Sequence, residues 1–86
     1  MLFMVIETYR GGDAKSVYQR FRDKGRMLPD GLTYVDSWIQ EDLSRCFQPM
    51  ECEDAGLLQR WADKWTDLIE FEFVPSDKAK ALAARL

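Results

Sequence analysis

The 86-residue chain contains no histidine and no asparagine. Without histidine it cannot use serine or cysteine catalysis with a histidine base, a histidine-ligated haem or a histidine-based pH switch. Without asparagine it lacks a residue that acylphosphatase-like chemistry uses. Two cysteines alone supply too few soft ligands for a structural zinc site. We therefore expect no metal, no cofactor and no assignable catalytic residue.

The two cysteines, Cys46 and Cys52, are six positions apart. In an extended segment their Cα atoms lie ~20 Å apart at ~3.3 Å per residue, far beyond the ~7 Å limit for a disulfide. An even spacing places both on the same face of a strand. We expect two buried free thiols.

The chain also lacks a long apolar run and an excess of positive charge. No segment approaches the ~18 apolar residues of a membrane span. The opening Met1–Ile6 has no basic region before it and runs directly into Glu7, so it does not resemble a signal peptide. Twelve basic and fifteen acidic residues give a net charge of -3, which disfavours nucleic-acid binding. These features predict a cytoplasmic protein that binds neither nucleic acid nor membrane.

Apolar and aromatic side chains, in contrast, are abundant. Hydrophobic residues make up 47% of the chain and aromatic residues 13%, in a length that fits a single domain over residues 1–86. A chain of this size buries only ~60–65% of its unfolded surface. The apolar content therefore indicates a second buried surface, such as an oligomer interface.

Hydrophobic periodicity predicts four strands and three helices. Asp13, Asp54 and Ser76 are the expected helix N-caps. The expected elements are a strand over Met1–Tyr9, a helix over residues 14–25, a hairpin of Leu32–Gln40 with Arg45–Glu53, a helix over residues 57–65, a strand over Leu68–Pro75 and a tail helix over residues 76–86. Pro49 lacks a ladder donor, so we expect a bulge or an early strand end near it.

This order predicts an α+β, ferredoxin-like βαββαβ fold, in which two helices cover one face of a four-stranded antiparallel sheet. We assign the purely aliphatic strand sides to the helices. The opposite, open face then carries Phe3, Val5, Glu7, Tyr9, Tyr34, Asp36, Trp38, Arg45, Phe47, Glu51, Glu70 and Glu72. A second copy of the chain would cover this apolar face and form a homodimer. The tail helix could instead fold back over it.

Two groups on this face are candidate ligand-binding residues. The first comprises the carboxylates Glu7, Asp36, Glu51, Glu70 and Glu72. These could hold a divalent cation or provide a base with a raised pKa, or they could pair with arginines or face water. The second group comprises Tyr34, Trp38, Arg45 and Phe47. Their rings could clamp a flat ligand while the guanidinium holds an anion, or they could pack in an interface.

Four segments resemble a small bacterial family known as domain-of-unknown-function family 3303: MLFMVIETY, VYQRFRDKGRMLPDGLTYVDSW, RCFQPMEC and LLQRWADKWTDLIEFEFVP. The resemblance covers roughly residues 1–75 and leaves the tail helix outside. It implies a fold of the dimeric α/β-barrel class. It implies no established activity.

Three functions remain open at this point. The first is a homodimer with an acidic-aromatic cavity between the two sheets, which binds or senses a small molecule or has a structural role. The second is a cofactor-free oxygenase or isomerase, in which Tyr34, Trp38 and Arg45 position the substrate and a carboxylate takes a proton. The absence of histidine and asparagine disfavours it. The third is a protein-interaction module that uses the basic helix residues Arg20, Arg22, Lys24 and Arg26.

Overall fold

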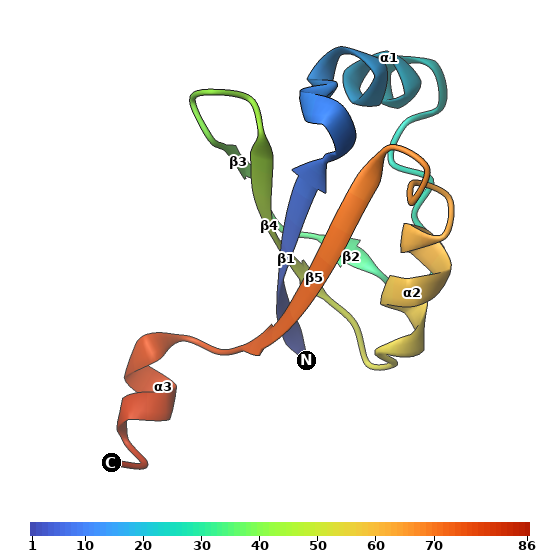
Figure 1. Ribbon diagram of the computed structural model, residues 1–86. Helices are drawn as coiled ribbons and strands as arrows, with labels where there is room; N and C mark the ends of the chain where they lie inside the picture. Colours follow the sequence, from blue (N-terminus) through green and yellow to red (C-terminus); the bar gives the residue numbers. More distant parts are fainter.

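The strand β1 (Leu2–Tyr9) lies at the centre of an antiparallel sheet in a computed structural model that describes residues 1–86 (Figure 1). One edge of β1 pairs with β4 (Arg45–Glu51) and the other with β5 (Ile69–Ser76). Two short strands, β2 (Thr33–Tyr34) and β3 (Trp38–Ile39), both pair with β4. The order along the sheet is therefore β2-β4-β1-β5, with β3 also paired to β4.

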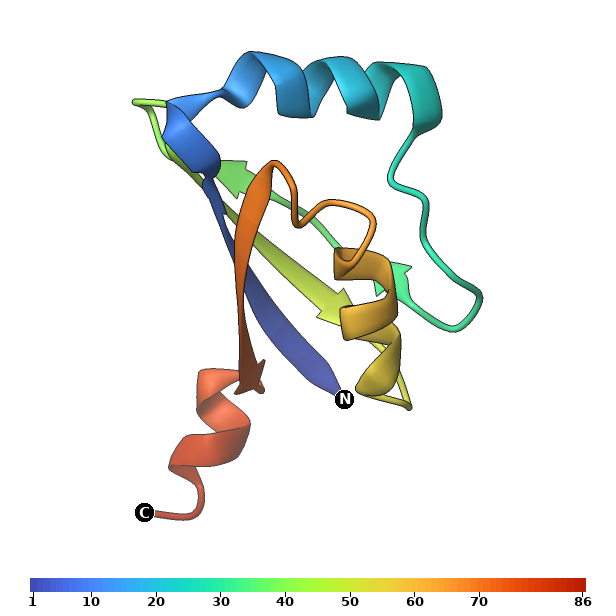
Figure 2. The same cartoon turned by 45° about the vertical axis from the view of Figure 1, so that its right-hand side comes forward.

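Two helices lie on one side of this sheet, α1 (Ala14–Lys24) and α2 (Gly56–Ala62) (Figure 2). A 3-10 turn, η1 (Arg10–Gly12), connects β1 to α1. The last helix, α3 (Ala79–Ala83), projects beyond the end of β5, and every residue from Asp77 onward is exposed. The tail helix therefore does not fold back over the sheet. The architecture is α+β with an open antiparallel sheet, and it is compatible with the ferredoxin-like prediction.

None of these helices has both the length and the apolar composition needed to cross a membrane.

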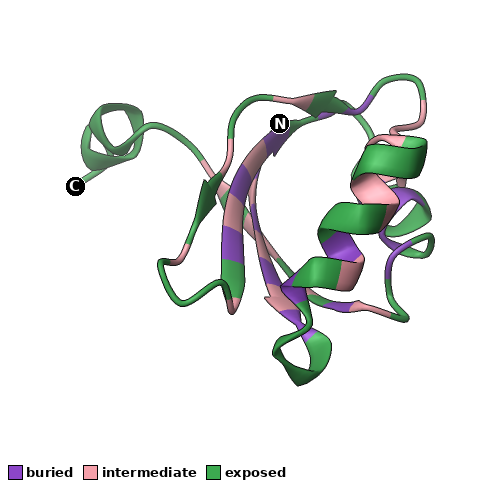
Figure 3. Ribbon diagram, turned by 90° about the horizontal axis from the view of Figure 1, so that it is seen from above, coloured by how far each residue is buried: buried purple, intermediate pink, exposed green.

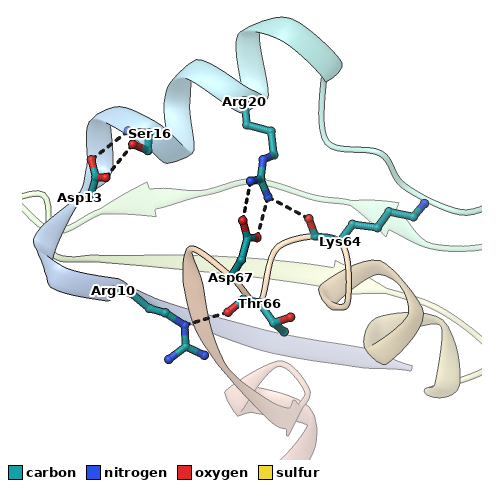
Figure 4. A network of polar contacts seen from close by, with 7 residues as sticks. All are labelled: Arg10, Asp13, Ser16, Arg20, Lys64, Thr66 and Asp67. Atoms are coloured by element: carbon teal, nitrogen blue, oxygen red, sulfur yellow. Dashed lines mark hydrogen bonds and ion pairs between the residues drawn. The ribbon is translucent and has the colours of Figure 1, made fainter.

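The predicted ends of α1 are confirmed. The Asp13 carboxylate accepts hydrogen bonds from the Ser16 backbone N–H at 3.0 Å and from the Ser16 hydroxyl at 2.6 Å, which caps the helix (Figure 4). Gly25 ends the helix with φ of +68°, a conformation that side-chain-bearing residues rarely adopt. The chain then turns sharply, so that Arg26 points back toward the sheet.

The predicted orientation of β1 is wrong. Phe3, Val5, Glu7 and Tyr9 are buried beneath the helices, whereas the aliphatic residues between them are half-buried on the other side. The same buried layer includes Cys46, Gln48 and Met50 of β4 and Ile69 of β5. The core between the sheet and the helices combines aromatic residues such as Phe3, Tyr9 and Trp61 with aliphatic ones such as Val5, Val17 and Leu58.

The opposite side of the sheet, called the open face below, has no helix over it (Figure 3). The strand register places on it Leu2, Met4, Ile6, Trp38, Arg45, Phe47, Pro49, Glu51, Glu70, Glu72 and Val74. Trp38 is 58% exposed. Both cysteines lie on the buried side and are free thiols, as predicted.

The expected bulge near Pro49 forms in the neighbouring strand, whereas the expected early strand end is wrong. β4 continues through Pro49, which pairs with Met4 in regular register. The Pro49 carbonyl accepts a hydrogen bond from the Val35 backbone N–H at 3.1 Å, on the side of β4 that faces β2 and β3. In an antiparallel strand the nitrogen and carbonyl of one residue point to the same neighbour, so the missing donor also faces that side. The interruption therefore falls in the neighbouring strand, between β2 and β3.

Because of this interruption, residues that should share one face of the sheet lie on opposite faces before and after it. Tyr34 pairs with Met50 on the helix side, whereas Trp38 pairs with Phe47 on the open face. One extra residue is inserted between these two pairs, as in a β-bulge. The predicted single strand from Leu32 to Gln40, with Tyr34 and Trp38 on one face, is therefore corrected.

An ion pair fixes α1 against the loop before β5. The Arg20 guanidinium donates to both carboxylate oxygens of Asp67, at 2.7 and 2.6 Å, and to the Lys64 carbonyl at 3.1 Å (Figure 4). Such a bidentate geometry fixes both direction and distance. It holds α1 over the sheet and leaves a space beneath it.

Truncation of Met50 tests which side of the sheet is the core. The side chain is fully buried, so we expect Met50→Ala to lower the free energy of unfolding by about 2–5 kcal/mol in urea denaturation. Val35→Ala is the control, because Val35 is 52% exposed and its truncation should change stability by less than about 0.5 kcal/mol. Equal effects of the two substitutions would contradict this core assignment.

Candidate functional site

A cavity of about 90 Å³ lies between the sheet and the helices α1 and α2. We call it the Glu7 cavity. Its polar and charged lining comes from β1, from the segments on either side of β2 and from β4, while α1 and α2 contribute mostly aromatic walls. The residues used in the argument below are Glu7, Tyr9, Arg26, Cys46, Gln48 and Trp61. Sequence elements far apart in the chain thus converge on one small volume.

Glu7 is the most unusual of these residues. It is only 6% exposed, yet no protein group donates a hydrogen bond to its carboxylate. No fully enclosed side-chain nitrogen or oxygen in the structure lacks a partner, so the Glu7 oxygens must retain open space beside them. That space is the cavity that Glu7 lines. Burial raises the pKa of Glu7 to about 7, and the positive charge of Arg26 opposes the rise without cancelling it.

Arg26 supplies the positive charge of the cavity. Its guanidinium carbon lies 3.6 Å from the centre of the Tyr34 ring and 4.8 Å from that of Phe21. The ion pairs of the structure join Arg10 to Glu70 and Arg20 to Asp67, and Arg26 takes part in neither. The two rings therefore orient the guanidinium through cation–π contacts, which leave its N–H edge free to bind an acceptor.

The backbone of Arg26 is fixed by two tryptophans of the opposite wall. The Trp61 and Trp65 indole N–H groups both donate to the Arg26 carbonyl, at 2.9 and 3.2 Å. Both tryptophans are buried, as their helical spacing predicts. They also tie the turn after α1 to the end of α2, which keeps the cavity open at a fixed width.

The remaining polar groups of the cavity are neutral at physiological pH. Burial raises the pKa of the Cys46 thiol to about 11 and also raises the pKa of Tyr9, so both keep their protons. Gln48 is 4% exposed and donates through Nε2 to the Met50 sulfur at 3.3 Å, while its carbonyl oxygen has no protein donor. The charges of the cavity therefore belong to Glu7 and Arg26.

The structure divides the predicted site residues between the two sides of the sheet. Glu7 lines the cavity, and Tyr34 stacks on Arg26 from the helix side, so their expected place on the open face is wrong. Asp36 lies in the interruption between β2 and β3, exposed, where its carboxylate accepts the Ser37 backbone N–H at 2.7 Å. The open face holds the others, Trp38, Arg45, Phe47, Glu51, Glu70 and Glu72. No group of three histidine, cysteine or acidic side chains is placed to hold a metal ion.

Part of the predicted aromatic cluster does form on the open face. Trp38 is the register partner of Phe47, and the Arg45 guanidinium carbon lies 5.2 Å from the centre of the Phe47 ring. Tyr34 is absent from this group because of the β-bulge. The predicted role of these three side chains in holding a ligand stays a prediction.

Arg26, Gln48 and Cys46 line the cavity, and the sequence analysis did not place any of them in a candidate ligand site. A signal for Gln48 was available, because it is the single polar residue in the alternating series from Cys46 to Cys52. A signal for Arg26 was its position directly after the glycine that ends α1. Neither signal indicates which side of β1 faces the helices, and the cavity depends on that choice.

The raised pKa of Glu7 makes stability depend on pH. Its pKa rises from about 4.5 in the unfolded chain to about 7 in the folded one, so between these values only the unfolded chain loses the proton. Stability then falls as pH rises from 4.5 to 7, by on the order of 3 kcal/mol from this group. We expect urea unfolding at pH 4.5, 6 and 8 to show this loss in the wild type, relative to Glu7→Gln. A constant difference between the two proteins across this range would contradict the burial of an unpaired Glu7.

Comparison with known proteins assigns the chain to a family. A search of curated proteins finds no match to it. One family model matches residues 1–86, the whole chain. The match includes the tail helix, so the expected limit of the resemblance near residue 75 is corrected. The chain belongs to the family described as a domain of unknown function, DUF3303.

Proposed function

We propose that this protein binds a small molecule in the Glu7 cavity. The observation that carries this proposal is that two opposite charges, Glu7 and Arg26, border the same partly open cavity without forming an ion pair. A buried carboxylate without a partner destabilises a fold, and a purely structural protein would gain stability by replacing it. A ligand between Glu7 and Arg26 would provide the missing partner for both charged groups.

The cavity suits a small and partly apolar ligand. Its volume of about 90 Å³ is below the ~150 Å³ of an engineered protein cavity that binds benzene. The Trp61 and Phe21 side chains offer apolar walls, and the charged groups offer direction. This cavity lies within one chain, beneath the helices, and the predicted cavity between the sheets of two copies stays a separate prediction.

Catalysis of a proton transfer is the second candidate function. A carboxyl group with a pKa of about 7 can both accept and donate a proton at neutral pH, which is what a general base requires. An isomerase reaction would fit, because it moves a proton and needs no cofactor. The basic helix face supports an interaction module less well, since Asp67 engages Arg20 and the cavity engages Arg26.

We also propose that the protein is a homodimer through the open face. The β1 residues Leu2, Met4 and Ile6 lie on the same face as Phe47 and Trp38. At the end of this face, Leu82 of α3 and Arg85 line a pocket together with Leu2. Contiguous apolar surface of this kind is typical of an interface. Acidic Glu70 and Glu72 lie on β5, while Arg45 lies on β4 at the other side of β1. A two-fold axis near β1 would bring opposite charges of the two copies together.

Binding in the cavity is tested with ¹⁵N-labelled protein and four probes: propanoate, propanamide, phenol and imidazole. The indole N–H signals of Trp61 and Trp65 report on the cavity, and that of Trp38 reports on the opposite side of the sheet. We expect at least one probe to shift the first two signals and leave the third unchanged. Val17→Phe, which fills the cavity from α1, should abolish the shift, and Val17→Ile should weaken it. If no probe acts at the cavity, the binding proposal is wrong.

The dimer is tested by light scattering on a size-exclusion column. We expect a mass near twice 10.1 kDa for the wild type. Phe47→Asp places a charge at the centre of the open face and should yield monomers. Gln19→Glu, which places a negative charge on the exposed side of α1, is the matched control and should remain dimeric. A wild-type monomer at micromolar concentration would rule out this interface.

A further inference from the structure

We infer that the Glu7 cavity selects small organic carboxylate anions, and that it takes up a proton when it binds one. The ligand carboxylate sits on the Arg26 guanidinium, and Glu7, in its protonated form, donates a hydrogen bond to it. This inference rests on the proposed binding function and specifies the chemistry of the ligand.

The choice of an anion follows from how Arg26 is held. Stacking against Tyr34 at 3.6 Å fixes the plane of the guanidinium and leaves its planar N–H edge without an acceptor. This edge matches the geometry of a carboxylate, which accepts two parallel hydrogen bonds. Arg20 shows the same preference within the protein, since it holds both oxygens of Asp67. A cationic ligand would be repelled by Arg26 at short range.

Proton uptake on binding follows from the presence of Glu7 in the same cavity. An ionised Glu7 would repel the ligand carboxylate, whereas the protonated form can donate an O–H···O⁻ bond, which is among the strong hydrogen bonds of proteins. Because burial places the pKa of Glu7 at about 7, about half of the molecules carry this proton at neutral pH. A bound anion stabilises the protonated form further, so the remaining molecules take up a proton on binding.

No other group in the cavity provides this proton linkage. The titratable groups that face Glu7 come from each packed element: Tyr9 on β1, Tyr18 on α1, Arg26 after α1 and Cys46 on β4. Tyr9 and Cys46 have pKa values raised by burial, so they remain protonated near neutral pH. The helix α2 contributes the uncharged Trp61, and β5 places Phe71 beside Glu7.

The size of the cavity limits the ligand to a few carbon atoms. A volume of about 90 Å³ accommodates a carboxylate and a short apolar chain. The chain would lie against Trp61 and Phe21, which form part of the apolar lining. Small carboxylic acids of this type therefore fit all three features of the cavity: the charge of Arg26, the proton of Glu7 and the apolar walls.

The test compares propanoate with its neutral isostere propanamide, followed by the indole signals of Trp61 and Trp65 at pH 6 and pH 8. We expect propanoate to bind more tightly than propanamide at pH 6. Its affinity should fall about tenfold between pH 6 and pH 8, because a group with a pKa of about 7 must be protonated. Glu7→Gln keeps a hydrogen-bond donor, so it should bind propanoate with the same affinity at both pH values. Arg26→Gln should lose propanoate binding. Its ratio of propanamide affinities at pH 6 and pH 8 should equal that of the wild type.

A second measurement does not depend on any variant. Addition of propanoate to the wild-type protein in weakly buffered solution at pH 7 should raise the pH, because protons leave the solvent. Binding of propanoate without a pH rise, or with equal affinity at pH 6 and pH 8, overturns the proton uptake. Tighter binding of propanamide overturns the preference for anions but leaves the binding function intact. If phenol or imidazole shifts the cavity signals and neither propanoate nor propanamide does, the carboxylate class of ligand is wrong. If none of the four probes shifts these signals, the proposed binding function is wrong as well.

Discussion

The placement of Glu7 on the helix-facing side of β1 is the constraint on which the candidate site depends. β1 is paired along both edges, so its register fixes Glu7 between Cys46 on β4 and Phe71 on β5. The residue cannot turn to solvent unless the whole central strand shifts by one position, which would expose Val5 and Tyr9 as well. The free energy gained by burying Val5 and Tyr9 therefore keeps the Glu7 carboxylate in a buried position that it would not occupy by itself.

The surrounding structure leaves this carboxylate unpaired while holding an opposite charge nearby. Gly25 ends α1 with a positive φ, and the two indole N–H groups of α2 and the turn after it then bind the Arg26 carbonyl. Tyr34 and Phe21 hold the guanidinium between their rings. The ion pairs of the structure do not include Arg26 with Glu7. The aromatic contacts thus maintain the separation of charge that the cavity presents to a ligand.

The sequence predicts the elements of this fold better than the orientation of their faces. The caps at Asp13 and Gly25 are local signals, and β5 alternates clearly between Phe71 and Phe73 on one side and Glu70 and Glu72 on the other. β1 is apolar on both sides, so periodicity alone does not orient it. Its orientation depends on contacts far apart in the sequence, because its buried residues Phe3, Val5 and Tyr9 pack in one core with α1 and α2 residues such as Val17 and Trp61. The proline does indicate the β-bulge, but it does not indicate that the bulge lies in the partner strand rather than in β4.

The two sides of the sheet divide the tasks that the sequence analysis placed together. The open face carries apolar area, with a pocket at its end between Leu2 and the tail helix, which suits association with a second copy. The helix side holds a partly open, charged cavity that is too small for a protein partner. The two are separated only by the thickness of one sheet. Residues of β1 alternate between them, with Ile6 on the open face next to Glu7 in the cavity. A dimer that covers the open face would restrict the motion of β1, and would therefore also act on Glu7 in the cavity.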